Sequence, residues 1–285
     1  ISQKLKLEAS EIRKVNFYKE KIKNTTHYGM RITDNVIEDI FNKLIKKSNY
    51  KKRKAEINNF NKKNKVLKKG IAITPVKFGI SFTTTHLNQG GALVHIYTDG
   101  SIHLNHGGIE MGQGLMTKLA LVASNEFGLN YENIKISSTD TEKVPNTSAS
   151  AASATTDING AAIVNAINNI KSGLNEFIYG YFKTNSKIKY ENNFVYFDKR
   201  KISFKELINT AYLNRIPLSS SGFYKTDKIN VNTKTLQGRP FLYFTYGAAV
   251  TEVIIDKLTG ENKILQVDII HDVGNSINKR IDKGQ

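Results

Sequence analysis

Apolar residues in the first quarter of the chain recur at helical spacing. Within residues 35–45, an apolar side chain returns every three or four positions, which places these side chains on one face of a predicted helix. The rest of residues 1–69 is mostly polar, so we expect this face to dock on the domain that follows. The face consists of Val36, Ile37, Ile40, Phe41 and Leu44.

The character of the sequence changes near Gly70 and Pro75. After these residues, apolar and β-branched side chains become common and charged ones become sparse. Glycine and proline often mark such boundaries. The change predicts two parts, a helical and basic segment over residues 1–69 and a larger domain over residues 70–285.

Strand-like runs in the larger domain come in pairs that are joined by turn residues. In the first pair, Asp99-Gly100 tolerates the positive φ angles of a type I′ turn. We therefore expect two β-hairpins. They are residues 92–98 with 101–105 around Asp99-Gly100, and residues 244–256 with 263–271 around Leu258-Thr259-Gly260.

Helices alternate irregularly with these strands. Residues 115–127 carry apolar side chains on one face and meet Gly128, a residue type that commonly ends helices. A short strand over 134–138 and a second helix over 161–177 follow, and the next residues are polar and poorly patterned. The order lacks the regular alternation of a doubly wound sheet, so the predicted fold class is α+β, with mixed sheets and packed helices.

Composition narrows the possible chemistry. The 285 residues include no cysteine, which excludes disulfides, thiolate nucleophiles and Cys-ligated zinc or iron–sulfur centres within them. No apolar run approaches the roughly 20 residues needed to cross a bilayer. Nothing in the sequence indicates secretion or a membrane, so we expect a cytoplasmic protein.

The basic charge is concentrated near the start of the chain. The net charge is +17, and residues 1–70 hold 20 Lys/Arg against 7 Asp/Glu. The lysine runs at 51–54 and 62–69 could attract phosphates or an acidic partner surface. No aromatic residues alternate with these lysines to stack on bases, so nucleic-acid binding is not favoured and a solvated face is the simpler interpretation.

A glycine-rich loop, His106–Gly114, joins the end of a predicted strand to the start of a predicted helix. Such a junction presents unpaired backbone N–H groups and the positive end of the helix dipole, which favours a phosphate or an electron-rich cofactor. Gln113-Gly114 stands where a P-loop has Lys-Ser/Thr, and the third glycine of a dinucleotide fingerprint is absent. The loop alone therefore names no ligand, and a tight turn without one stays an alternative.

A second loop, Val144–Ser153, consists almost wholly of small residues. Their side chains are too short to shield the backbone, so a ligand could approach closely. In isolation such a composition is typical of a flexible connector. Two loops of this kind, each followed by a helix, favour a cofactor cradle.

Other candidate sites have weaker support. His103 and His106 have a separation seen in metal sites, but on a strand they point to opposite faces and no third ligand lies nearby. His271-Asp272 accompanies no nucleophile motif. We interpret these histidines as structural.

Several motifs resemble the xanthine dehydrogenase family of molybdenum hydroxylases in both order and spacing. Phe78–Phe82 is most similar to the purine-oxidising members, and His86–Gln89 resembles the bacterial two-subunit form. The resemblance covers nearly the whole chain and implies an internal part of the molybdopterin-binding subunit. The motifs are Pro75–Thr83, His86–Gly100, His106–Gly114, Val144–Ser148, Tyr246–Val253, Leu258–Gly260, Asp272–Asn278 and Ile281–Gln285.

The resemblance also implies roles for individual residues. Gln113 is similar to a glutamine beside the molybdenum and the pterin, and Phe82 to a phenylalanine that stacks edge-on against the purine ring. Glu110 matches a structural position, and the family's catalytic base lies in a Gly-Glu-Pro-type segment absent from these residues, so no catalytic residue is assigned. The implied cofactor-binding residues are Gly112, Gln113, Ala151, Ala152, Ser153 and Gln285, and the implied substrate-binding residues are Phe82 and Thr83.

The reaction that the resemblance implies is molybdenum-dependent hydroxylation of purines, from hypoxanthine or xanthine to urate. The implied cofactor is molybdopterin with molybdenum, while 2Fe–2S clusters and FAD are expected on a partner subunit or in other segments. The implied partners are that iron–sulfur/FAD subunit and a purine substrate, within a higher oligomer of the two subunits. Residues 1–69 would then join two molybdenum-binding halves. An aldehyde-oxidising relative and an inactive fragment with a basic anion-binding surface are the alternatives.

Overall fold

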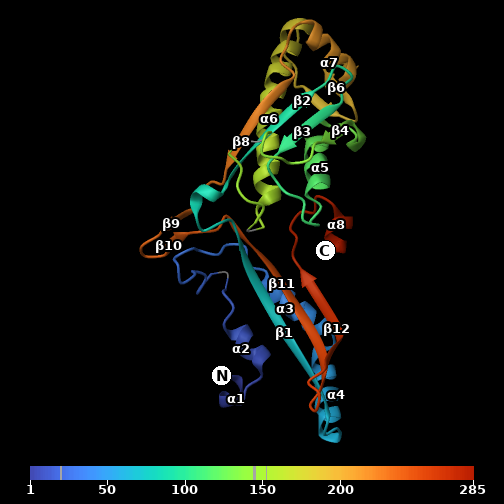
Figure 1. The fold of residues 1–285 in the computed structure, drawn as a ribbon. Coiled ribbons are helices and arrows are strands. Elements are labelled where there is room, and N and C mark those ends of the chain that lie inside the picture. Colours follow the sequence, from blue (N-terminus) through green and yellow to red (C-terminus); the bar gives the residue numbers. More distant parts are fainter. Residues whose placement is uncertain (20, 144–145, 152) are drawn as a thin grey trace. The chain divides into compact units, whose positions relative to one another are not determined.

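The computed structural model combines helices with antiparallel and parallel strand pairs (Figure 1). The predicted α+β class, mixed sheets with packed helices, is confirmed. Within the described part of the chain, no helix is both long and apolar enough to cross a membrane. The description covers residues 1–19, 21–143, 146–151 and 153–285.

The chain divides into two compact units, each of which takes two separate stretches of sequence. Residues 1–80 and 232–274 form the first unit, and residues 81–231 and 275–285 form the second. A short strand, β9 (Asn230–Asn232), lies where the chain passes from the second unit back to the first.

The helices and strands have the following bounds. The first unit holds α1 (Ser2–Leu5), α2 (Ala9–Val15), α3 (Ile37–Lys47), α4 (Tyr50–Lys63), β1 (Leu67–Ile80), β10 (Gln237–Arg239), β11 (Tyr243–Asp256) and β12 (Asn262–His271). The second unit holds the 3-10 turns η1 (Thr85–Leu87) and η2 (Tyr131–Asn133), strands β2 (Gln89–Ile96), β3 (Ile102–His106), β4 (Ile134–Ile136), β5 (Lys189–Glu191), β6 (Phe194–Phe197), β7 (Arg200–Ser203) and β8 (Ser219–Lys225), and helices α5 (Leu115–Phe127), α6 (Thr155–Phe182), α7 (Phe204–Leu213) and α8 (Lys279–Gly284).

The first unit is built on an antiparallel sheet in the order β1-β11-β12. The predicted helix, α3, lies against this sheet (Figure 1) and therefore docks within its own unit. Phe41 and Leu44 of the helix and Ile73 and Tyr246 of the sheet are each at most 1% exposed. Val36 was expected on the apolar face, but it precedes the helix and is 37% exposed.

The boundary near Gly70 does not coincide with the division into units. Gly70 lies inside β1 and pairs with Val253 of β11. The change in composition at Gly70 marks the start of a strand, and the partner of that strand lies far away in sequence. The local sequence therefore does not reveal that residues 232–274 belong to the first unit.

The second unit contains a four-stranded sheet in the order β4-β3-β2-β8, with α5 and α6 on one face (Figure 1). The β3–β4 pair is parallel and the other two pairs are antiparallel. Leu104, Leu119, Ala162 and Ile163 are 0% exposed in the core between the sheet and the helices. This core fixes the positions of the loops that follow β3 and precede α6.

The helix predicted over residues 115–127 is confirmed as α5, and Gly128 ends it in the left-handed conformation at φ 61°. The β11–β12 hairpin is also confirmed. The helix predicted over 161–177 extends further at both ends, from Thr155 to Phe182, and its buried face continues toward the N-terminus through Ile158 and Thr155.

The hairpin of β2 and β3 is confirmed, but the predicted type I′ turn is wrong. Tyr97 and Ser101 form the last pair, which leaves a three-residue loop. Gly100 alone in this loop has a positive φ, at 85°, and its N–H donates to the carbonyl of Tyr97. This pattern is that of a type I turn followed by a left-handed glycine.

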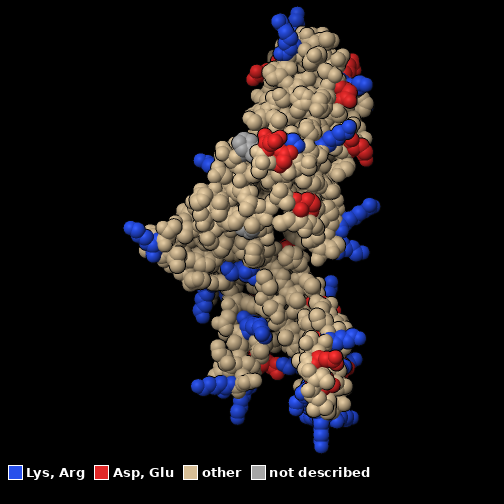
Figure 2. Space-filling model, viewed as in Figure 1, with Lys and Arg blue, Asp and Glu red and all other residues tan. Residues whose placement is uncertain are grey.

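Four of the five lysines of α4 are solvated. Lys51, Lys52, Lys62 and Lys63 are exposed, and Figure 2 shows Lys and Arg side chains projecting from the surface where α4 lies in Figure 1. Arg53 of the same helix turns inward and pairs with carboxylates of β11 and β12. The helix therefore combines a solvated basic surface with an arginine that forms two ion pairs to the sheet.

Candidate cofactor-binding site

The glycine-rich loop runs from the end of β3 at His106 to the start of α5 at Leu115, as the sequence predicted. Leu115 is 0% exposed, so the core holds the helix end of the loop. Gly112 and Gly114 adopt φ angles of 97° and 73°, which side chains other than glycine rarely tolerate. The loop can therefore fold back tightly over the start of α5.

The backbone N–H groups at the start of α5 are already paired with Glu110. Its carboxylate accepts from the N–H of Gly112 and Gly114, each at 2.9 Å, and from Met116 at 3.2 Å. Desolvation opposes ionisation of Glu110, but these backbone hydrogen bonds outweigh it and lower the pKa. The expectation that this helix end offers unpaired N–H groups to a phosphate is therefore wrong, because the chain supplies its own anion. An ionised side chain held in this way fits a structural role.

The side chain of Gln113 forms hydrogen bonds with the backbone of the same loop. Its Oε1 accepts the N–H of Met111 at 2.5 Å, and its Nε2 donates to the carbonyl of Ile109 at 2.9 Å. These two bonds hold the amide against the backbone of the loop, and Gln113 is half-buried. Because an amide nitrogen carries two hydrogens, one N–H of Gln113 is left for a ligand.

The C-terminal segment contacts the glycine-rich loop. Gln285 donates from Nε2 to the carbonyl of Gly112 at 3.0 Å. Ile281 of α8 packs against Gly114, where a Cβ would lie 2.6 Å from the Ile281 Cδ1. The structure thus brings together Gly112, Gln113 and Gln285, three residues that the sequence had placed at one site.

The small-residue loop lies beside the glycine-rich loop. Ser150 Oγ accepts the N–H of Ile109 at 2.7 Å, and Thr147 packs on Gly107. Ala151 and Ser153 are exposed, while Ala152 lies outside the described residues. The two loops therefore lie against each other.

Asn159 is a buried residue of this site that the sequence reasoning missed. It is 3% exposed, its Oδ1 accepts the N–H of Gly107 at 3.2 Å, and its Nδ2 donates to the carbonyl of Thr155 at 2.8 Å. It links the glycine-rich loop to the first turn of α6. An asparagine near the start of a helix was the available signal, but it named no partner.

His106 is a neutral residue that holds the start of the glycine-rich loop through a hydrogen bond. It is 1% exposed, and its Nδ1 accepts the N–H of Gly108 at 3.1 Å, which leaves the proton on Nε2, 3.2 Å from the Met116 sulfur. Burial lowers the pKa of His106 from 6.5 to about 4. This residue is structural, in agreement with the interpretation from the sequence.

The pKa of His106 predicts that the loop loosens in acid. Between pH 6.5 and about 4 the opened loop binds a proton that the closed loop excludes, so stability is fully present above pH 6.5 and falls as the pH approaches 4. We expect local opening to become easier by about 2 kcal/mol between pH 7 and pH 5. Amide-exchange protection factors of Gly107 and Gly108 measure this change. A His106→Asn variant should show little pH dependence, and an equal dependence in both proteins would contradict the assignment.

The loop that follows β1 carries Phe82 and Thr83. Phe82 is half-buried and Thr83 is exposed. Ser81 is 4% exposed and has a φ of 137°, a conformation that costs a residue with a side chain about 1–3 kcal/mol. The side chain of Asn88, 1% exposed, bonds to both backbone groups of Phe82. Sequence reasoning found Phe82 and Thr83 but missed the strained Ser81 and the buried Asn88.

This loop and the small-residue loop are joined through Gln89. The Gln89 N–H donates to Ser148 Oγ at 3.2 Å, and the Ser148 N–H donates to the Gln89 carbonyl at 3.0 Å. The expected substrate residues are therefore tied, through β2, to the loop of the expected cofactor residues.

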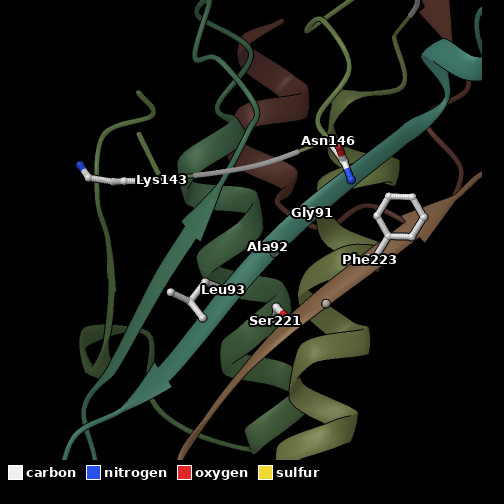
Figure 3. Close-up of a pocket in the computed structure, with 8 residues that line it drawn as sticks. Gly91, Ala92, Leu93, Lys143, Asn146, Ser221 and Phe223 are labelled. Carbon is white, nitrogen blue, oxygen red and sulfur yellow. The ribbon is translucent and has the colours of Figure 1, made fainter. Parts of the chain in front are cut away.

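A groove of about 410 Å³ lies in the second unit beside the small-residue loop, whose Asn146 lines it. Leu93, Ser221 and Phe223 present their side chains along β2 and β8 in Figure 3. None of the described residues expected to bind cofactor or substrate lines this groove. Its sparse polar lining identifies no ligand.

The two loops fit a molybdopterin. A Cβ added to Gly112 would meet no atom within 4 Å, so the outer side of the glycine-rich loop is open. Gln113 and Gln285 each keep one amide N–H beyond the bonds described above. The exposed Ala151 and Ser153 leave nearby backbone accessible. The site thus offers neutral donors and an unshielded backbone to a polar, ring-shaped group.

The fold is shared with a dehydrogenase and two oxidoreductases of known structure. Carbon monoxide dehydrogenase from Oligotropha carboxidovorans matches with a TM-score of 0.80 and 19% identity, covering 99% of this chain and 36% of that one. Quinoline 2-oxidoreductase from Pseudomonas putida matches with a TM-score of 0.80 and 20% identity, covering 99% and 37%. Aldehyde oxidoreductase from Desulfovibrio desulfuricans gives 0.76 and 22%, covering 99% and 28%. At these identities the likeness establishes the fold alone.

The family follows from the sequence comparison. The model of the molybdopterin cofactor-binding domain matches residues 43–285, and the chain belongs to this family. Xanthine dehydrogenase/oxidase from Gallus gallus is 45% identical over 100% of the chain, and xanthine dehydrogenase from Dictyostelium discoideum is 41% identical over 100%. Each match covers 20% of the relative, so the chain spans about a fifth of the length of these proteins.

Proposed function

We propose that this chain is the part of a molybdenum hydroxylase that supplies one side of a molybdopterin site and of a purine pocket. The observation that carries the proposal is the meeting of Gln113, Gly112 and Gln285 beside the loop of Ala151 and Ser153. The identity of 45% to a xanthine dehydrogenase/oxidase supports purines as the substrate class. The cofactor-binding set in this proposal is Gly112, Gln113, Ala151, Ala152, Ser153 and Gln285, and the substrate-binding set is Phe82 and Thr83.

In this proposal, bound molybdopterin supplies the redox chemistry that hydroxylates an electron-poor ring carbon. The free amide N–H groups of Gln113 and Gln285 orient the cofactor by donating hydrogen bonds to it. Glu110 keeps the glycine-rich loop folded and takes no part in proton transfer, because its carboxylate faces the start of α5. Phe82 orients the ring of the substrate, and Thr83 offers a hydroxyl next to it.

The rest of the proposed enzyme lies outside these residues. An iron–sulfur/FAD subunit or segment would take up the electrons, and the two kinds of subunit would form a higher oligomer. Residues 1–69 would join this part to another molybdenum-binding half. A cytoplasmic location is part of the same proposal.

Dye reduction with hypoxanthine tests the proposal in the full-length protein, purified with its native partners. We expect Gln113→Ala to lower turnover roughly 10- to 100-fold, because it removes a hydrogen bond to a polar group in the site. Gln266→Ala, which removes an exposed glutamine of β12, is the matched control and should keep full activity. Molybdenum content is measured in all three proteins.

The dye-reduction assay also distinguishes purines from aldehydes as the substrate class. Wild-type protein that holds molybdenum but does not oxidise hypoxanthine would contradict the purine assignment. Turnover of aldehydes by the same preparation would then favour the aldehyde-oxidising alternative, which the fold shared with an aldehyde oxidoreductase also allows.

A further inference from the structure

The Asn88 side chain uses almost all of its hydrogen-bonding capacity on one short loop. Its Oδ1 accepts the N–H of Phe82 at 2.7 Å, and its Nδ2 donates to the carbonyl of Phe82 at 2.9 Å. The same Nδ2 lies 3.2 Å from the carbonyls of Thr84 and of Thr85. A single amide thereby fixes the backbone on both sides of Thr83.

Asn88 is itself held by the sheet. It is 1% exposed, its N–H donates to the carbonyl of Thr85 at 3.1 Å, and its carbonyl accepts the N–H of Thr226 at 2.9 Å. Thr226 directly follows β8, and Asn88 directly precedes β2, so the clamp is anchored where two paired strands begin and end. The loop therefore takes its position from the core of the second unit.

The loop needs such a clamp because its backbone is strained at Ser81. A φ of 137° is unfavourable for a residue with a Cβ, and strained residues persist only where their surroundings overdetermine them. Phe82 comes directly after this residue. Without the Asn88 bonds, Ser81 could relax toward negative φ, and the ring of Phe82 would turn away from its place.

We propose that Asn88 is a positioning residue for substrate recognition, which presents the ring of Phe82 and the hydroxyl of Thr83 to a heteroaromatic substrate in one fixed orientation. This inference rests on the proposed function, since it assigns Phe82 and Thr83 to the substrate. Asn88 acts through the loop backbone and does not itself touch the substrate. Its contribution is to substrate binding, so its loss raises KM more than it lowers kcat.

Steady-state kinetics of the full-length protein with hypoxanthine test this division. We expect Asn88→Ala to raise KM about tenfold while kcat changes less than threefold and molybdenum content stays at the wild-type level. Asn193→Ala is the matched control, because Asn193 also accepts a backbone N–H, from Asn130 at 2.7 Å, in the same unit but in a different loop. It should leave KM unchanged. Equal KM values for Asn88→Ala and wild type would overturn the proposal. A loss of kcat that is the same in Asn88→Ala and in Asn193→Ala would also overturn it, because the effect would then not be specific to the Phe82 loop.

Asn88→Asp adds a readout that a general loss of stability would not move. An ionised aspartate still accepts the Phe82 N–H but repels the three carbonyls, whereas a protonated aspartic acid can donate to one of them. Burial raises the pKa of such a carboxyl group. KM relative to wild type at the same pH should therefore rise between pH 6 and pH 8 in Asn88→Asp, and a flat ratio would count against the clamp.

The substrate assignment and the clamp can fail separately. Wild-type protein without hypoxanthine turnover would contradict the proposed substrate. The same KM comparison would then be made with benzaldehyde, whose aromatic ring also requires a fixed Phe82. An unchanged KM for that substrate in Asn88→Ala would overturn the positioning role, and a tenfold rise would support it.

Discussion

Replacing Gly222 with Ala is expected to destabilise the packing of α6 on the sheet of the second unit by about 3 kcal/mol. A Cβ at this position of β8 would lie 2.1 Å from the carbonyl oxygen of Ala162 and 2.5 Å from the amide nitrogen of Ala166. Both atoms belong to the backbone of α6, so no side-chain rotation can relieve the overlap. The helix must move away from β8 and lose part of the core that Ala162 and Ile163 form.

Amide exchange of α6 in the full-length protein measures this effect. A change of about 3 kcal/mol corresponds to roughly 150-fold faster exchange at the buried positions of the helix. Gly173→Ala is the matched control, because a Cβ there meets no atom within 4 Å and alanine is the better helix former. It should slow exchange slightly. Similar exchange in Gly222→Ala and wild type would show that α6 can shift without cost.

The parts of the fold that the sequence predicted are those with local signals. The helix α5 has a single apolar face and ends at Gly128, and the β11–β12 hairpin is closed by a short turn. Strand partners that are distant in sequence have no such signal. The pairing of β1 with β11 and that of β2 with β8 depend on packing across the whole unit, so the boundary between the units could not be read locally.

The middle of the chain shows a signal that the sequence reasoning left unused. The antiparallel strands β5, β6 and β7 and the helix α7 lie in the stretch described as polar and poorly patterned. Ser203 accepts the N–H of Glu206 and so caps the start of α7. Ser-x-x-Glu before an apolar run is a recognised sign of a helix start. The short strands before it are three or four residues long, too short for a clear alternation.

The candidate site was predicted in part for a similar reason. Glycine and small residues mark the two loops, and the family resemblance selected Gln113 in the first loop and Gln285 in the C-terminal segment. The hydrogen-bond partners of Glu110 and Asn88 depend on how the loops fold. No sequence pattern predicts that a loop carboxylate will accept hydrogen bonds from the first N–H groups of the next helix. The helix end does attract a negative group, as electrostatics predicts, but that group is the carboxylate of Glu110 in the loop itself.

Replacing Gly107 with Ala is expected to abolish cofactor loading, if the two loops together hold molybdopterin as proposed. A Cβ on Gly107 would lie 2.1 Å from Thr147 Oγ1 and 2.3 Å from Thr147 Cβ. The overlap involves Thr147 Cβ, which cannot rotate away, so the two loops must separate. Separation also pulls the Gly107 N–H from Asn159. We expect the molybdenum content of the purified full-length protein to fall at least tenfold.

A second substitution distinguishes loop separation from general unfolding. Thr147→Gly removes the three side-chain atoms that a Cβ added at Gly107 would meet, so the double variant Gly107→Ala/Thr147→Gly should recover most of the molybdenum content. Circular dichroism should show wild-type helix content in both variants, because α5 and α6 are held by their own core. Full loading of the single variant would show that the loops need not touch to hold the cofactor. Equally poor loading of the single and double variants would mean that Gly107 is required for a reason other than its contact with Thr147, most directly for approach of the cofactor to its backbone.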